Sequence, residues 1–110
     1  MALSQIGQFT LKQQGAYVAR TQVRYMDENG DWQMSSQTSN ELAAQTYDID
    51  PGDLKVPDGS IVTYYLWVMA GKDVLAQESF KYAKGSQNKA LYRCSNVTVA
   101  PVLEYEGVGK

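Results

Sequence analysis

The chain is poor in the residue types that most often carry catalytic or metal chemistry. Its 110 residues include no histidine and a single cysteine, Cys94. This scarcity removes the commonest general base and metal ligand, and it excludes an intrachain disulfide, a Cys/His zinc domain and a Cys–His nucleophile. We expect Cys94 to be a small buried thiol. The sequence therefore predicts a protein that is not an enzyme, with no catalytic residues, no metal site and no cofactor.

A strong excess of one charge and a long apolar run are also lacking. The 10 basic and 12 acidic residues give a net charge of −2, so we expect no binding of duplex nucleic acid, which usually requires a basic surface. The longest apolar run, YYLWVMA at 64–70, is too short for a membrane-spanning helix. The first residues lack the features of a signal peptide. We expect the chain as given to be soluble, and secretion by a route without a classical signal peptide stays open.

Short period-two patterns dominate what is present. In segment 16–26, Tyr17 and Val23 alternate with polar residues, as in a strand with one wet face. Comparable segments, separated by turn residues such as Asn29-Gly30, lie at 6–12, 31–35, 45–49, 60–70, 74–83, 89–95 and 97–105. Pro101 places the last of them at a sheet edge or a bulge. The pattern predicts one domain over residues 1–110, an all-β antiparallel sandwich of about eight strands.

The aromatic residues are mostly tyrosine and tryptophan, which combine an apolar body with a polar tip and favour interfaces. Segment 60–70 is apolar on both faces, which predicts either a central strand covered on both sides or a core strand whose outer face meets a partner. Core positions are expected for Tyr17, Tyr25, Tyr65 and Trp67. The aromatic residues for which a core position is less secure are Trp32, Tyr64, Tyr82 and Tyr105.

The acidic stretch YMDENGDWQM at 25–34 raises the question of a calcium site. Asp27, Asn29 and Asp31 match the first three ligand positions of an EF-hand loop, but Gly30 is at the fourth position instead of the sixth, and the twelfth is Thr38. The flanking segments alternate like strands, so we interpret the stretch as a hairpin turn. A calcium site of another kind, shared with the acidic segment 48–58, is the less favoured alternative.

A basic stretch at 80–93 interleaves lysines with aromatic residues. This mixture suits anionic lipid headgroups, sugars or single-stranded nucleic acid. The favoured explanation is an ordinary hairpin with outward charges that prevent edge-to-edge pairing. The candidate ligand-binding residues are Trp32, Tyr64, Tyr82, Lys81, Lys84, Lys89 and Arg93.

The order of segments resembles a family of known proteins. GAYVARTQVRYMDENGDW (15–32), YDIDPGD (47–53) and VPDGSIVTYYLWV (56–68) form a long hairpin, an acidic turn and a hydrophobic return strand. This layout, over residues 6–105, resembles small bacterial β-sandwich proteins of the membrane-active aegerolysin and actinoporin kind. The resemblance implies recognition of membrane lipids. It does not extend to an inserting N-terminal helix, because MALSQIGQFTLK is patterned as a strand.

Two functional hypotheses follow. The first is a non-enzymatic binding module that recognises a membrane lipid headgroup or a glycan, such as a cytolysin-like or toxin-associated component. It would dock through aromatic loop tips, assisted by Lys81, Lys84, Lys89 and Arg93. The second is a self-assembling protein that pairs with copies of itself or with another protein through β edges and the two-sided segment 60–70.

Overall fold

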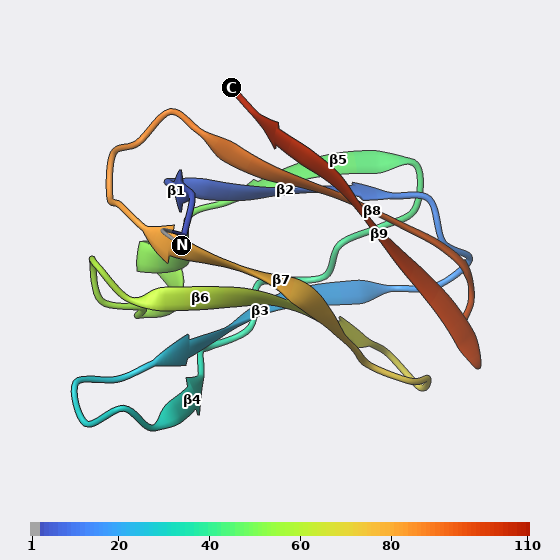
Figure 1. Ribbon diagram of the computed structural model, residues 1–110. Coiled ribbons are helices and arrows are strands. Elements are labelled where there is room, and N and C mark those ends of the chain that lie inside the picture. Colours follow the sequence, from blue (N-terminus) through green and yellow to red (C-terminus); the bar gives the residue numbers. More distant parts are fainter. Residues whose placement is uncertain (1–2) are drawn as a thin grey trace.

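Two β-sheets packed face to face form the computed structural model, which describes residues 3–110 (Figure 1). One sheet has five strands in the order β1-β7-β6-β3-β4, and the other has four in the order β5-β2-β8-β9. The strands are β1 (Gln5–Ile6), β2 (Gln8–Gln13), β3 (Ala19–Met26), β4 (Trp32–Met34), β5 (Gln45–Ile49), β6 (Ile61–Val68), β7 (Val74–Tyr82), β8 (Lys89–Val97) and β9 (Ala100–Gly109). The predicted all-β sandwich is confirmed.

The sheets are mixed where the sequence predicted antiparallel pairing throughout. Strand β1 pairs with β7 in parallel, and β2 pairs with β8 in parallel. The cause lies in the first residues, which pass from the five-stranded sheet in β1 to the four-stranded sheet in β2 at Gly7. A side chain at Gly7 would overlap the carbonyl oxygen of Ser86, so this close crossing requires glycine.

The connection from β4 to β5 contains no helical turn, although the sequence allowed one. Residues 35–41 instead run beside β3, and the amides of Ser35, Thr38 and Glu41 donate to carbonyls of that strand. This segment covers much of the free edge of β3. A short 3₁₀ turn follows β5 at Pro51–Leu54, and the side chain of Asp50 caps it by accepting from the amide of Gly52.

The core between the sheets is built on aromatic rings. Phe9 on β2 lies 5.4 Å from Tyr64 and 6.0 Å from Phe80 between ring centroids. Tyr64 and Tyr92 stack at 4.8 Å with an interplanar angle of 16°. These four side chains come from both sheets, so they join the two layers at the centre of the sandwich.

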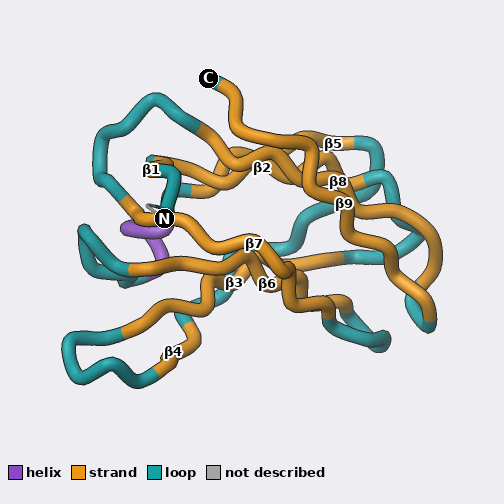
Figure 2. Tube along the Cα trace, in the orientation of Figure 1, coloured by secondary structure: helices purple, strands orange, loops and turns teal. Residues whose placement is uncertain are grey.

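The loops gather at the two ends of the sandwich (Figure 2). One end carries residues 14–18 and 42–44, which pass between the two sheets, and residues 69–73 and 97–99, which connect neighbouring strands. The opposite end carries the β3–β4 turn, residues 50–60 and residues 84–88. The described chain ends also lie there, because Gln5 pairs with Lys81 and Gly109 pairs with Lys89. Within residues 3–110, no helix is long and apolar enough to span a membrane.

Candidate functional site

Two of the aromatic residues predicted to contact a ligand belong to the core. Tyr64 is fully buried and Tyr82 is 1% exposed. The Tyr82 hydroxyl donates to the Asp50 carboxylate, and burial and this bond raise the pKa of Tyr82 to about 12. Inward-facing rings cannot meet a surface ligand, so the structure corrects the assignment of Tyr64 and Tyr82 to a binding surface.

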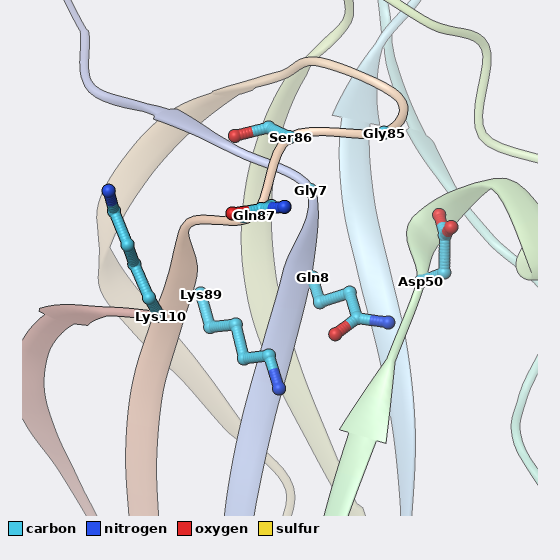
Figure 3. Close-up of a pocket in the computed structure, with 8 residues that line it drawn as sticks. All are labelled: Gly7, Gln8, Asp50, Gly85, Ser86, Gln87, Lys89 and Lys110. Carbon is cyan, nitrogen blue, oxygen red and sulfur yellow. The ribbon is translucent and has the colours of Figure 1, made fainter.

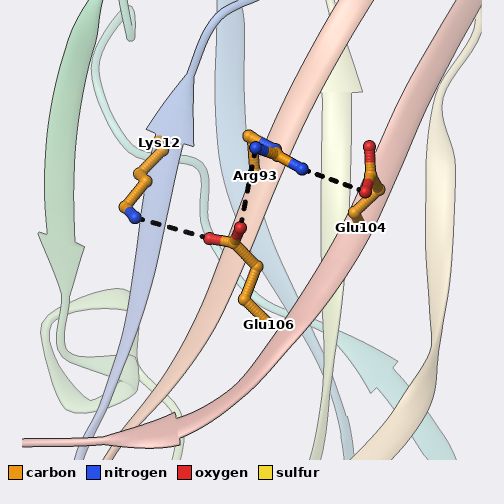
Figure 4. Close-up of polar contacts among 4 residues, drawn as sticks. All are labelled: Lys12, Arg93, Glu104 and Glu106. Carbon is orange, nitrogen blue, oxygen red and sulfur yellow. Dashed lines mark hydrogen bonds and ion pairs between the residues drawn. The ribbon is translucent and has the colours of Figure 1, made fainter.

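The four predicted basic residues do not form one surface. Lys89 pairs with Asp48 at 3.1 Å, and Arg93 pairs with Glu104 at 3.1 Å (Figure 4). Both residues lie on the outer side of the four-stranded sheet. Lys81 belongs to β7 of the other sheet, and Lys84 follows that strand. Because two charges are paired and the sheets differ, the predicted basic patch is split.

A shallow hollow beside Lys89 is lined by charged residues of both signs, two lysines and one aspartate. Its volume is about 400 Å³, and it is lined by Gly7, Gln8, Asp50, Gly85, Ser86, Gln87, Lys89 and Lys110. The two lysines lie on one side of the close-up and Asp50 lies on the other (Figure 3). Since Lys89 also pairs with Asp48, we do not assign an anion site here.

The acidic stretch at 25–34 is a hairpin turn, as predicted. The carboxylate of Asp27 accepts from the amides of Asn29 at 2.9 Å and Asp31 at 3.0 Å, and from the side chain of Gln33 at 3.0 Å. The bonds to Asp31 and Gln33 hold the pKa of Asp27 below its usual value. Across residues 3–110, no group of three or more His, Cys, Asp or Glu side chains is placed to hold a metal ion.

An apolar surface that the sequence analysis did not identify lies at the end formed by loops 14–18, 42–44, 69–73 and 97–99. We call it the apolar end. Four aliphatic side chains are exposed there: Leu42 at 48%, Met69 at 37%, Val97 at 44% and Val99 at 68%. Within these four loops the charged residues are Lys72 and Asp73. Its members come from loops far apart in sequence, so no local pattern revealed it.

The loops of the apolar end are held together by their backbones. The amide of Lys72 donates to the carbonyl of Thr98 at 3.0 Å, and the amide of Ala16 donates to that of Asn96 at 2.9 Å. The amide of Ala44 donates to Gln13 at 2.6 Å. These bonds connect each loop to a neighbour, so the aliphatic side chains project from an ordered base.

Two of these loops contain a non-glycine residue with positive φ, and a third such residue, Asn96, lies in β8 just before loop 97–99. The angles are 65° at Ala44, 54° at Ala70 and 76° at Asn96. Alanine adopts this region at a cost of roughly 1–2 kcal/mol, because its Cβ approaches the carbonyl oxygen. Backbone strain of this kind is concentrated at functional surfaces more often than elsewhere. Lys55, with φ of 71°, ends the 3₁₀ turn at the opposite end, so three of the four such residues in the described chain lie at or beside the apolar end.

Gly71 sets the distance between two of the hairpins. A Cβ at this position would overlap the carbonyl oxygen of Thr98 and would lie 2.9 Å from a methyl group of Val68. We predict that Gly71→Ala lowers the free energy of unfolding by roughly 1–3 kcal/mol, the usual cost of overpacking, as measured by chemical denaturation. Gly109→Ala, where a Cβ would meet the mobile end of Leu91 at 3.1 Å, is the matched control. Equal losses in the two variants would contradict the close contact.

A polar hollow adjoins the apolar end. It has a volume of about 440 Å³ and is lined by Lys12, Gln14, Ala43, Ala44 and Thr46. The Lys12 ammonium lies 3.5 Å from Glu106 and its side chain is 49% exposed. The hollow thus places hydrogen-bond donors beside the exposed Leu42 loop.

A buried carboxyl lies directly behind this loop. Glu41 is 2% exposed and accepts from the Thr21 hydroxyl at 2.6 Å, and that hydroxyl is also 2.7 Å from the Tyr64 hydroxyl. Burial raises the pKa of Glu41 to about 7. Cys94 is a buried thiol as predicted, and it donates to the side chain of Gln13.

Of the aromatic residues in the predicted ligand-binding set, Trp32 is exposed, at 40%. The guanidinium of Arg24 lies 4.6 Å from the centre of its ring. Tyr65 and Trp67, which we expected in the core, are half-buried on the outer side of β6, while Tyr17 is in the core as expected.

Comparisons with known proteins show a likeness of fold. No protein-family model and no curated protein matches the chain. The crystal structure of listeriolysin O aligns with a TM-score of 0.52 at 16% sequence identity, over 92% of this chain and 22% of that one. The chain therefore spans about a fifth of the listeriolysin O length.

Two further structures align less closely. Pneumolysin aligns with a TM-score of 0.45 at 14% identity, and a protein described as a trapped toxin aligns with 0.46 at 18%. Each alignment covers 92% of this chain and 23% of the other. The specific resemblance to aegerolysins or actinoporins gains no support from these matches. What is supported is coarser: the β-rich fold of this chain is similar to a part of listeriolysin O.

Proposed function

We propose that the protein is a non-enzymatic module that binds a membrane lipid surface through its apolar end. The observation that carries the proposal is the gathering of Leu42, Met69, Val97 and Val99 on three loops at one end of the sandwich. Exposed aliphatic side chains grouped in this way are typical of surfaces that meet a membrane or another protein. The described chain ends lie at the opposite end, so they do not obstruct this approach.

The energetics favour shallow insertion. Full burial of a valine or leucine side chain contributes roughly 1.5–3 kcal/mol, so partial burial of four aliphatic side chains in the boundary between headgroups and acyl chains gives several kcal/mol. Lys72 adds attraction to anionic lipids of about 1 kcal/mol. The neighbouring Asp73, whose carboxylate accepts from the Tyr65 hydroxyl at 2.6 Å and the Val68 amide at 3.0 Å, keeps its negative charge and offsets part of this attraction.

The polar hollow gives the headgroup a place beside the inserted side chains. Gln14 and Thr46 supply an amide and a hydroxyl there, which can hydrogen-bond to a lipid headgroup, while the Lys12 ammonium is already paired with Glu106 at 3.5 Å. The similarity of fold to part of listeriolysin O, a protein named as a lysin, is in keeping with a toxin-associated role. In the proposed mechanism aliphatic side chains contact the membrane, instead of the aromatic loop tips expected from the sequence. Lys81, Lys84 and Lys89 take no part in it.

Liposome co-sedimentation tests the proposal. With phosphatidylcholine vesicles, with or without phosphatidylserine, we expect Leu42→Asp/Val99→Asp to partition at least about tenfold more weakly than wild type, a difference of about 1.4 kcal/mol. Val97 and Val108 offer a matched pair, because they are 44% and 43% exposed at opposite ends of the sandwich. Val97→Asp should weaken binding and Val108→Asp should not.

Three results would count against this mechanism. Equal effects of Val97→Asp and Val108→Asp would mean that general hydrophobicity, and not the apolar end, controls binding. Loss of binding on changing Lys81, Lys84 and Lys89 to Gln would show that the basic stretch at 80–93 binds the lipid. Binding that requires a glycolipid and ignores the aspartate substitutions would identify a glycan as the ligand.

A self-assembly role is the second candidate, and the free edge of β9 favours it. This strand has ten residues at the edge of the four-stranded sheet and exposes Val102 at 40% and Val108 at 43%. Long edges with apolar side chains pair readily with other strands. A defined oligomer in lipid-free solution, measured by light scattering, with no pelleting on vesicles, would favour assembly over membrane binding.

A further inference from the structure

The outer side of the five-stranded sheet carries an unusual group of side chains. Register places Arg20 opposite Trp67 and Gln22 opposite Tyr65 on β3 and β6. It also places Arg24 opposite Met34, and Met26 opposite Trp32, on β3 and β4. We call the resulting surface the Trp–Arg face, and its members are Arg20, Arg24, Trp32, Met34, Tyr65 and Trp67. Both tryptophans of the chain therefore lie on it.

Each tryptophan of this face has an arginine stacked on it. The guanidinium of Arg20 lies 5.0 Å from the centre of the Trp67 ring, and that of Arg24 lies 4.6 Å from the Trp32 ring. Arg20 also donates to Asn40 and Gln37, each at 2.9 Å. These neutral contacts fix the position of the cation without neutralising it, because stacking and amide bonds leave its charge in place.

The arginines of this face differ from Arg93 in their partners. Over residues 3–110, the ion pairs within 4.0 Å involve Lys12, Lys89 and Arg93, and neither Arg20 nor Arg24 takes part in one. Arg93, on the opposite side of the sandwich, pairs with Glu104 and Glu106. The Trp–Arg face therefore presents two positioned cations that have no carboxylate within ion-pair distance in this part of the chain.

The composition of the face is that of a protein contact surface. Trp, Tyr, Arg and Met are enriched where proteins meet, and Trp, Tyr and Arg supply most residues whose truncation strongly weakens binding. Trp32 and Met34 are 40% and 44% exposed, so apolar area remains to be covered. A nucleic acid is disfavoured, because the face holds two cations in a chain of net charge −2, whereas nucleic-acid-binding surfaces usually carry a basic patch or stripe. The acidic β3–β4 turn adjoins Trp32, so an acidic partner must place its carboxylates at Arg20 and Arg24 and not beside that turn.

We propose that the Trp–Arg face binds an acidic segment of a protein partner. Carboxylates of the partner would accept from the guanidinium groups of Arg20 and Arg24 in the two-pronged geometry that arginine favours. The partner's backbone and side chains would cover Trp32 and Met34. A second copy of the chain is disfavoured, because pairing two such faces brings four arginines together. The inference does not depend on membrane binding, since it uses the side of the sandwich and not its apolar end.

Tryptophan fluorescence gives a direct test, because both tryptophans lie on this face. We expect poly-L-glutamate to change the emission saturably, and Arg20→Gln/Arg24→Gln to weaken its binding at least about tenfold. Arg93→Gln removes one positive charge from the opposite side and is the control for each single variant, Arg20→Gln or Arg24→Gln, with an expected change of less than about twofold. Arg24→Lys keeps the charge but loses the planar fork, so it should weaken binding to an intermediate degree.

The contrary outcomes are distinct. Equal weakening by Arg93→Gln would show a response to total charge and would overturn the assignment to this face. Saturable binding of heparin or of phosphatidylserine vesicles with no response to poly-L-glutamate would identify a glycan or a membrane instead. Absence of any binding, or an oligomer in solution that Arg20→Gln/Arg24→Gln dissociates, would also overturn it. Circular dichroism melting of each variant separates loss of binding from loss of folding.

Discussion

The protein is expected to lose about 3 kcal/mol of unfolding free energy as the pH rises from about 4.5 to about 8, through Glu41 alone. Glu41 is 2% exposed, and burial raises its pKa from 4.5 to about 7. A raised pKa means that the folded state binds a proton more tightly than the unfolded state. The contribution of Glu41 is therefore most favourable below pH 4.5 and is lost as the pH rises through 7.

Glu41→Gln provides the measurement. The amide keeps an oxygen that accepts from the Thr21 hydroxyl but it cannot ionise. We expect the variant to be more stable than the wild type at about pH 8 by roughly 1–3 kcal/mol, and to lose this advantage at about pH 5. Urea denaturation at a series of pH values gives the two curves. Parallel curves would contradict the prediction, as would a carboxyl pKa near 4.5 for Glu41 in an NMR titration.

This titration bears on the apolar end because Glu41 precedes Leu42 in the chain. The amide of Glu41 donates to Ala19 at 2.7 Å and the amide of Ala19 donates back at 3.1 Å, so this residue fixes the start of the 42–44 loop. An ionised carboxylate in the core favours local opening, since water would solvate the charge. Faster hydrogen exchange at the amides of 42–44 above pH 7 is the expected consequence.

Phe9→Ala is expected to cost about 3–5 kcal/mol of unfolding free energy, the usual range for removing a fully buried aromatic ring. The ring of Phe9 is 0% exposed. Its centroid lies 5.4 Å from Tyr64, 6.0 Å from Phe80 and 6.1 Å from Tyr92. Because these neighbours belong to both sheets, removing the ring loosens the contact between the layers as well as creating a cavity.

Chemical denaturation of Phe9→Ala and Phe9→Leu tests this account. Leucine fills much of the space, so its cost should be clearly smaller than that of alanine. Val102→Ala, at a valine that is 40% exposed on the β9 edge, should change stability by less than about 0.5 kcal/mol. A loss below about 1 kcal/mol for Phe9→Ala would mean that the ring does not join the sheets.

The alternation along strand 60–70 illustrates where sequence reasoning stops. The pattern separates Val62, Tyr64, Leu66 and Val68 from Ile61, Tyr65, Trp67 and Met69, and the structure keeps this division. The alternation does not show which set faces inward, because both sets are apolar. Packing settles it: Tyr64 stacks on Tyr92 inside, while Trp67 lies under Arg20 outside. The assignments of Tyr64 and Tyr65 were therefore exchanged.

The basic stretch shows the same limit for charge. Sequence proximity grouped Lys81, Lys84, Lys89 and Arg93, but β7 and β8 belong to different sheets. Whether a cation is paired can depend on strands distant in sequence, as with Lys89 and its partner Asp48 on β5. Neither the neutralisation of Arg93 nor the lack of an ion pair at Arg24 was visible beforehand.

By itself the sequence determined the strands, the turn at 27–31, the buried thiol of Cys94 and the all-β sandwich. These depend on period-two alternation, turn chemistry and residue type, all of which are local. The tertiary structure alone decided the parallel pairings, the apolar end and the Trp–Arg face. Each of these arises where segments far apart in the chain meet, as loops 69–73 and 97–99 do through the bond from the Lys72 amide to the Thr98 carbonyl. Because such surfaces form where distant segments pair, they cannot be predicted from local sequence patterns.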